Sequence, residues 1–307
     1  MTIWRDFWHR TRRSLEGPLT ANVTGTRQGE IAIERLEDTR SRFLKPRRTV
    51  EVFLPTGYYG PGTERYPVLY LNDGQDSESL HLAAALERCQ HEGSAAPIVV
   101  VAIHATGDRI REYGTAGVPN AQGYGDRASQ YEQFILTELM PFIQSRYRVL
   151  TGSPATAIAG LSLGGLSAFD VAWRNPDRFG AVGVMSGSFW WRTNDRSPEM
   201  KQASRIMHRR VRETPGRPAL RMWFETGVRD ETADRDGDGV IDSIQDTEEL
   251  VEEILRKGYQ AGRDVIHVTV PGGHDLPTWR VALPEMLRWL YGRTEAVQLG
   301  ARWLSSS

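Results

Sequence analysis

The stretch AIAGLSLGGLSAFDVA, residues 157–172, decides the fold. It opens with apolar residues typical of a strand, passes through Gly160-Leu161-Ser162-Leu163-Gly164, and continues as a run of helix formers. A G-x-S-x-G pattern between a strand and a helix holds a serine on a sharp, exposed turn. The glycines permit that turn, and the helix directs its first backbone N–H groups at the reacting centre. The stretch therefore predicts that Ser162 is a nucleophile and that the N–H of Leu163 is an oxyanion donor.

Short apolar strands alternate with helical stretches on both sides of this segment. Several strands are almost continuous apolar runs, as expected where helices cover both faces of a sheet. The alternation predicts an α/β protein with a mostly parallel central sheet and helices on both faces. A capping box at Asp246 and Glu249 predicts where the fourth helix starts. We expect strands at 48–55, 67–73, 97–103, 155–162, 180–186, 219–226 and 264–270, and helices near 78–91, 128–146, 164–174, 247–257 and 280–291.

The chain divides into three parts around this pattern. Residues 45–292 form one catalytic domain, residues 293–307 form a C-terminal tail, and residues 1–44 form a segment with a short helix and a lead-in strand packed on the core. Trp4, Phe7 and Trp8 lie at helical spacing in that segment. Their apolar face would dock on the protein's own body or on a partner subunit, which leaves a homo-oligomer open.

The composition excludes several classes of protein. The 307 residues are 39% hydrophobic and 25% charged, and the net charge is -1. These are values of a globular protein, and they give no electrostatic reason to expect a nucleic acid partner. No apolar run approaches the roughly 18 residues of a membrane span. The single cysteine, Cys89, and the lack of a readable export signal predict a cytoplasmic protein without disulfides.

A nucleophilic serine needs a base, and the order of the catalytic residues along the chain limits which histidine can be that base. In strand–serine–helix hydrolases the acid and then the histidine follow the serine. His274 follows the last predicted strand in the Gly-rich stretch PGGHDLPTWR (271–280) and is the candidate base. His267 lies inside that strand, where a packed or paired role is expected. His104 precedes Ser162, so it has the wrong order for the base, although it could line the pocket.

Candidates for the remaining roles lie directly after strands. Asp230, in the loop after the strand that reaches residue 226, is the favoured orienting acid. Glu225 at the strand tip is the second candidate and Asp234 the third. Gly74 and Gln75 follow an early strand, where a second oxyanion donor is expected.

Together these motifs resemble the esterase family that includes enterochelin (ferric-siderophore) esterases, feruloyl esterase domains and mycolyltransferases. The resemblance is clearest to the enterochelin esterase-like branch and spans roughly residues 45–292. It is carried by VLYLNDGQD (68–76), GLSLGGLSAFDVAWRNPDRFGAVGVMSGSFWW (160–191), ETGVRDE (225–231) and GGHDLPTWR (272–280). The resemblance implies the α/β-hydrolase fold and no organic cofactor. It also implies a catalytic triad of Ser162, Asp230 and His274. The oxyanion hole would be formed by the backbone of Gln75 and Leu163. The substrate cleft would be lined or flanked by Arg109, Trp190 and Trp191.

The expected function is a serine carboxylesterase that hydrolyses a small-molecule ester through an acyl-enzyme. Four alternatives stay open: an acyltransferase with the same triad, a siderophore-ester hydrolase in the strict sense, a non-catalytic binding or scaffold protein, and a calcium-responsive module built on the acidic loop at 233–242. Enterochelin esterases carry a folded N-terminal domain that helps form their substrate site. Fewer than fifty residues precede the strand expected at 48–55, so generic ester hydrolysis is the expectation here. For Trp190 and Trp191, a plain core role is as good an interpretation as a place in the cleft.

The acidic stretch ADRDGDGVID (233–242) has the spacing of a calcium loop. Alternate residues would supply the ligands at loop positions 1, 3, 5, 7 and 9, namely Asp234, Asp236, Asp238, the carbonyl of Val240, and Asp242. Position 12 is Gln245, which lacks the usual carboxylate. The stretch therefore predicts either a structural Ca²⁺ that orders the loop beside Asp230 or an acidic, solvated turn.

Overall fold

A single ten-stranded sheet runs through the computed structural model, which describes residues 13–15 and 19–292. The strand order is β1-β2-β3-β4-β6-β5-β7-β8-β9-β10. Neighbouring strands from β1 to β6 pair antiparallel, and those from β6 to β10 pair parallel. The strands are β1 Arg13–Leu15, β2 Thr20–Gln28, β3 Ile31–Arg40, β4 Arg48–Leu54, β5 Val68–Asn72, β6 Val99–Ile103, β7 Thr156–Leu161, β8 Ala181–Met185, β9 Arg221–Arg229 and β10 Val265–Gly273.

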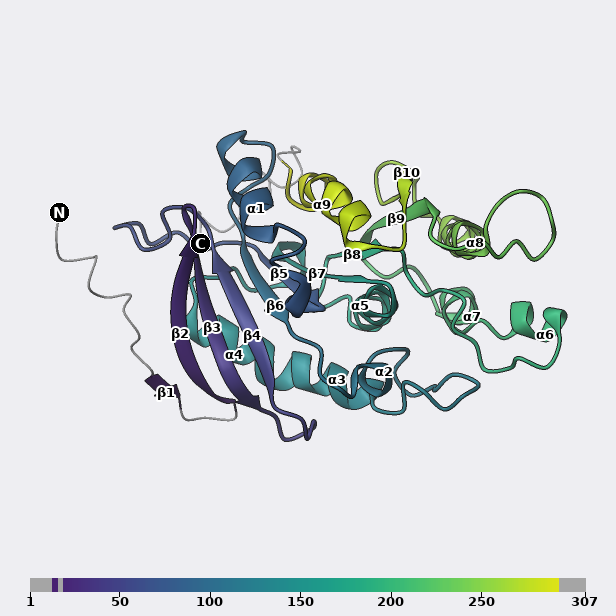
Figure 1. Cartoon of the computed structure of the whole chain (residues 1–307), viewed down its shortest axis with the longest axis horizontal. Coiled ribbons are helices and arrows are strands. Elements are labelled where there is room, and N and C mark those ends of the chain that lie inside the picture. The colour runs from purple at the N-terminus through teal and green to yellow at the C-terminus, as the bar shows by residue number, and fades with distance from the viewer. Residues whose placement is uncertain (1–12, 16–18, 293–307) are drawn as a thin grey trace.

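Helices cover the sheet on both faces (Figure 1). Two helices, α1 and α9, share one apolar cluster, whereas α3, α4, α5, α7 and α8 contribute to the cluster on the opposite face. The helices are α1 Leu82–His91, α2 Arg109–Glu112, α3 Ala128–Phe134, α4 Met140–Arg146, α5 Leu163–Arg174, α6 Pro198–Ala203, α7 Ile206–Glu213, α8 Asp242–Arg256 and α9 Leu276–Tyr291. A π-helical segment, Ile135–Leu139, joins α3 to α4, so the single helix expected over 128–146 is interrupted.

Burial explains the apolar runs of the sequence. Every residue of β5, β6, β7 and β8 is buried, because helices lie against both faces of these central strands. Each predicted strand is present within a few residues of its expected bounds. The structure therefore confirms the predicted α/β-hydrolase architecture.

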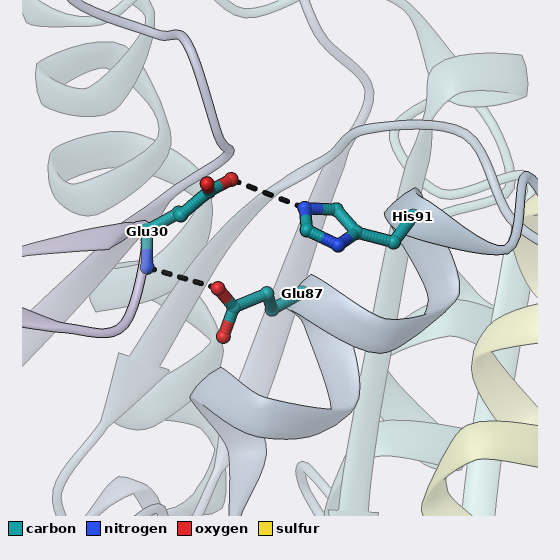
Figure 2. A group of neighbouring side chains, drawn as sticks. All are labelled: Glu30, Glu87 and His91. Atoms are coloured by element: carbon teal, nitrogen blue, oxygen red, sulfur yellow. Dashed lines mark hydrogen bonds and ion pairs between the residues drawn. The ribbon is translucent and has the colours of Figure 1, made fainter.

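More of the sheet precedes residue 45 than the sequence suggested: where one lead-in strand was expected, the structure has β1, β2 and β3. The strand expected at 48–55 is preceded by the long hairpin of β2 and β3, which extends the sheet by antiparallel pairing. The two-residue turn of the hairpin, Gly29–Glu30, is fastened to α1 (Figure 2). The Glu30 N–H donates to Glu87 Oε1 at 3.1 Å, and Glu30 Oε2 lies 3.1 Å from His91 Nε2. The N-terminal helix expected at Trp4, Phe7 and Trp8 and the tail 293–307 lie outside the described residues.

Helix α8 corrects the predicted capping box. It begins at Asp242, four residues before Asp246, so Asp246 and Glu249 lie inside the helix. Asp246 is buried and binds Arg205 and Arg235, and Glu249 also binds Arg205. The two carboxylates therefore form ion pairs with distant arginines instead of capping their own helix. Helices α6 and α7 were not among the expected helices.

Candidate active site

Ser162 occupies a strained turn between β7 and α5. Its backbone has φ 54° and ψ −122°, a conformation that non-glycine residues rarely adopt outside functional sites. The close approach of strand and helix requires glycine on both sides of the serine. A Cβ on Gly160 would lie 2.3 Å from the carbonyl oxygen of Gly164, and a Cβ on Gly164 would lie 2.3 Å from Asp73 Oδ2. The local sequence thus forces the Ser162 side chain out of the turn.

The structure brings His274 against this serine. His274 follows β10 directly, and its Nε2 lies 2.8 Å from Ser162 Oγ although the two residues are 112 positions apart in the chain. The edge of Trp279, from the first turns of α9, packs on the imidazole with ring centroids 5.0 Å apart. The Trp279 indole N–H in turn donates to Ser186 Oγ at 2.8 Å. The imidazole is thereby held between α9 and the serine.

Asp230 faces the other nitrogen of the imidazole. Its Oδ2 lies 3.9 Å from His274 Nδ1, longer than a hydrogen bond but within the range of an ion pair. The Asp230 side chain is 1% exposed, whereas that of His274 is 39% exposed. One nitrogen of the imidazole therefore faces Ser162, and the other faces the buried carboxylate of Asp230.

Glu225, the second candidate for the acid, has a different environment. It is fully buried on β9, and no hydrogen-bond donor in the described part of the chain reaches either of its carboxyl oxygens. Burial, followed by repulsion from Asp230, raises the pKa of Glu225 to about 8. No ion pair between Glu225 and His274 is present, in contrast to Asp230.

The loop after β5 lies directly beneath the serine turn. Asp73 adopts a left-handed conformation, φ 58°, and begins a 3-10 turn over Gly74–Asp76 that contains Gln75. The Asn72 side chain donates to the carbonyl of Gly164 at 2.8 Å, which ties this loop to the first turn of α5. Within the described ranges, no hydrogen bond joins the backbone N–H of Gln75 or Leu163 to another element. These two N–H groups lie on two segments that the Asn72 side chain ties together next to the serine turn.

The three predicted cleft residues have different positions. Arg109 Nε and Nη2 bind both oxygens of Asp73 at 2.7 and 2.8 Å, so this guanidinium braces the loop after β5. Trp191 is 2% exposed and packs against Gly114 and Gly125, which makes it a core residue. Trp190 is 42% exposed and lies just beyond the loop in which the Ser188 N–H donates to the carbonyl of Ser162.

The acidic loop keeps three of its predicted calcium ligands together. Carboxylate oxygens of Asp234, Asp236 and Asp238 lie within 4.8 Å of one another. Asp242 instead begins α8 and binds Arg235, and the Val240 N–H donates to Asp238 Oδ1. A second group that could hold a metal ion by its spacing is the hairpin contact of Figure 2. There the Glu30 carboxylate already binds His91, and the Glu87 carboxylate accepts the backbone N–H of Glu30.

Sequence reasoning missed two residues of the site. Asp73 joins Arg109, the side chain of Gln75 and the serine turn, and Trp279 supports the imidazole. Their places in the chain gave some signal, since Asp73 directly follows a buried strand and Trp279 lies five residues after His274. His267 behaves as expected: it is paired with Thr226 at 2.8 Å, and burial lowers its pKa to about 4.

Relatives of known description share this architecture. The chain is 26% identical over 250 residues to an iron(III) enterobactin esterase of Escherichia coli strain K12, which covers 81% of this chain and 54% of that protein. It is 28% identical over 161 residues to an endo-1,4-beta-xylanase/feruloyl esterase of Xylanibacter ruminicola, which covers 50% of this chain and 21% of that protein. The chain thus spans about half or less of the length of these two relatives.

Solved structures agree on the fold. A ferulic acid esterase superposes with a TM-score of 0.63 and 24% identity, covering 85% of this chain and 96% of that one. Among the described residues, no helix combines the length and the apolar content needed to cross a bilayer. The sequence model of the Esterase family, described as "Putative esterase", matches residues 41–290, a range that includes Ser162, Asp230 and His274. The expected resemblance is therefore confirmed, and the chain belongs to this esterase family.

Proposed function

We propose that this protein is a serine carboxylesterase that hydrolyses a small-molecule ester through an acyl-enzyme. The observation that carries the proposal is the 2.8 Å contact between His274 Nε2 and Ser162 Oγ on a strained turn. The names of the relatives, an enterobactin esterase and a feruloyl esterase, support ester hydrolysis as the reaction.

In the proposed mechanism, each step uses a side chain or backbone N–H group of the candidate site described above. Ser162 Oγ attacks the ester carbonyl carbon while His274 Nε2 takes the hydroxyl proton. The carbonyl oxygen becomes an oxyanion, to which the backbone N–H groups of Gln75 and Leu163 donate. His274 then passes the proton to the leaving alkoxide, and the C–O bond breaks to give the acyl-enzyme and the free alcohol. Asp230 fixes the imidazole tautomer and stabilises the imidazolium.

Water completes the cycle by the same route. His274 takes a proton from water, the hydroxide adds to the acyl carbon, and the Ser162 oxygen leaves with the proton returned by the imidazolium. The product is the carboxylic acid. A free alcohol in place of water would give acyl transfer, so the partition between the two acceptors distinguishes a hydrolase from an acyltransferase.

The exposed residues around the serine favour an aromatic acyl group. Trp190, Tyr124 and Ile110 are large apolar side chains that are each 42–43% exposed. Trp190 follows the loop that contacts Ser162, Ile110 lies on α2, and Tyr124 lies in the loop after α2. The Ala121 N–H donates to the carbonyl of Arg192, which holds the two loops together. An aromatic ring stacked on Trp190 would gain apolar burial and ring contact. Feruloyl and catecholate esters are therefore the first substrates to test.

The test compares wild-type protein with Ser162→Ala on p-nitrophenyl esters, methyl ferulate and a catecholate siderophore. Loss of the nucleophile should lower kcat by about 10^4- to 10^6-fold with the fold intact by circular dichroism. An organophosphonate probe should label Ser162 in the wild type. Near-normal turnover by Ser162→Ala would refute the assignment, and acyl transfer to an added alcohol in preference to water would make the protein an acyltransferase.

A further inference from the structure

Glu225 is a buried acid that the mechanism above does not use. Its backbone carbonyl, in the middle of β9, accepts the N–H of Ser186 at 2.8 Å. Its strand neighbours in register are Met185 on β8 and Val268 on β10, which carry no charge. The apolar cluster on this face, to which α9 contributes Trp279, adds none either. A carboxyl group in such surroundings, with no side-chain donor and only the backbone N–H of Ser186 beside it, costs free energy unless something compensates it.

The Asp230 carboxyl lies close enough to Glu225 to repel its charge. The chain turns back after β9, where the Asp230 N–H donates to the carbonyl of Gly227 at 3.2 Å. Asp230 Oδ1 lies against Gly227, so closely that a Cβ there would be 2.6 Å from it. Neither Asp230 oxygen has a hydrogen-bond donor in the part of the chain that the structure describes. Gly227 is two residues after Glu225 on β9, so the Asp230 carboxyl lies on the face of the strand from which the Glu225 side chain projects, and neither carboxyl has a side-chain hydrogen-bond donor.

One proton shared between the two carboxyl groups would remove the buried charge of Glu225 and give Asp230 a hydrogen-bond donor. Two adjacent buried carboxylates repel and cannot both ionise readily, so one of them keeps its proton. Glu225 holds it at neutral pH because burial and repulsion from Asp230 raise its pKa to about 8. The O–H of Glu225 then needs an acceptor, and Asp230 needs a donor.

We infer that Glu225 is a positioning residue of the active site: a neutral carboxylic acid that donates a hydrogen bond to Asp230 and orients it toward His274. The inference rests on the proposed function, since it assigns Asp230 the role of orienting acid. With one oxygen held by Glu225, the other is directed at His274 Nδ1, now 3.9 Å away. Glu225 contacts neither substrate nor the reacting atoms and acts only through Asp230.

Two substitutions separate hydrogen bonding from mere packing. Glu225→Gln keeps a donor in its amide NH₂ and cannot titrate. Glu225→Met has a similar size but neither donor nor charge. For a p-nitrophenyl ester at pH 7, the kcat of Glu225→Gln should stay within about threefold of wild type. The kcat of Glu225→Met should fall by roughly 10- to 100-fold with little change in KM, because a hydrogen bond to an ionised group is lost.

The pH dependence of kcat is the decisive measurement, because a purely structural role of Glu225 would not change it. Above the pKa of about 8, wild-type Glu225 loses its proton and becomes a second negative charge beside Asp230. Wild-type kcat should therefore fall on the alkaline side toward the level of Glu225→Met. The profile of Glu225→Gln should stay flat through the same range, and that of Glu225→Met should be low throughout.

The outcomes distinguish this inference from the proposed function. If Ser162→Ala abolishes activity but all three pH profiles have the wild-type shape and height, the serine mechanism stands and the role of Glu225 is refuted. If Ser162→Ala leaves activity unchanged, the proposed function fails first. Circular dichroism melts of both Glu225 variants check that lost activity is not lost folding.

Discussion

Replacing Glu225 by glutamine should make the protein less sensitive to alkaline pH as a folded structure, independently of catalysis. A carboxyl whose pKa is raised on folding binds its proton more tightly in the native state than in the unfolded chain. As pH rises, the unfolded chain releases this proton first, so the native state loses relative stability. The loss begins near the ordinary pKa of 4.5 and is complete above the native pKa of about 8.

The structure sets the size of this effect. Glu225 is fully buried, so solvent does not screen it. Each pH unit between the two pKa values corresponds to about 1.4 kcal/mol. From 4.5 to pH 7 the wild type should therefore lose about 3 kcal/mol of unfolding free energy through this residue, and from 4.5 to 8 about 5 kcal/mol. Glu225→Gln carries no proton to release and escapes this loss.

Urea denaturation of both proteins at a series of pH values measures the difference directly. The free energy of unfolding of Glu225→Gln minus that of wild type should be constant below about pH 4.5, rise by about 3 kcal/mol at pH 7, and level off above pH 8. Glu253→Gln is the matched control, because a hydrogen bond from Arg212 lowers the pKa of that carboxyl. That variant should lose stability relative to wild type as pH rises through the acidic range. A Glu225 difference that does not change with pH, or that changes in the control's direction, would refute the reasoning.

Three further predictions follow from the site and its surroundings. Asp230→Asn should lower kcat by about 10^4-fold through the wrong imidazole tautomer, far more than Glu225→Gln, and the reverse ranking in steady-state assays would transfer the acid role to Glu225. If the loop at Asp234, Asp236 and Asp238 binds Ca²⁺ in the native state alone, thermal melts should shift upward with added Ca²⁺ relative to EGTA. Unchanged melts, with no calcium in the purified protein, would leave a solvated turn. Esterase activity should be indifferent to dithiothreitol because Cys89 is a buried free thiol, and strong inactivation would contradict the prediction of a protein without disulfides.

Features that depend on neighbouring residues could be predicted from the sequence. The continuous apolar runs of β5 to β8 follow from burial on both faces, and the turn at Ser162 follows from the glycines at 160 and 164. The order of serine and histidine along the chain selected His274 among seven histidines, and the structure brings its imidazole to the serine. These features could be read because spacing and local backbone preference specify them.

Other features depend on contacts between distant residues, and only the tertiary structure decided them. The hairpin of β2 and β3 joins the sheet through pairing with β4, although its own sequence lacks a clear alternation. Asp246 and Glu249 have the spacing of a capping box, but Arg205, about forty residues earlier in the chain, binds both. The sequence of a helix does not indicate which distant arginine will form an ion pair with one of its carboxylates.

The identity of the orienting acid is the clearest feature that the sequence alone did not determine. Glu225 and Asp230 are five residues apart and have the same functional group, but Glu225 lies within β9 and Asp230 directly follows it. What separates them is where the chain turns after β9: one carboxyl comes to face His274, and the other is sealed among apolar side chains. Desolvation then gives the two acids different protonation states. Burial is a property of the assembled core, so the sequence alone could name both acids but could not assign their roles.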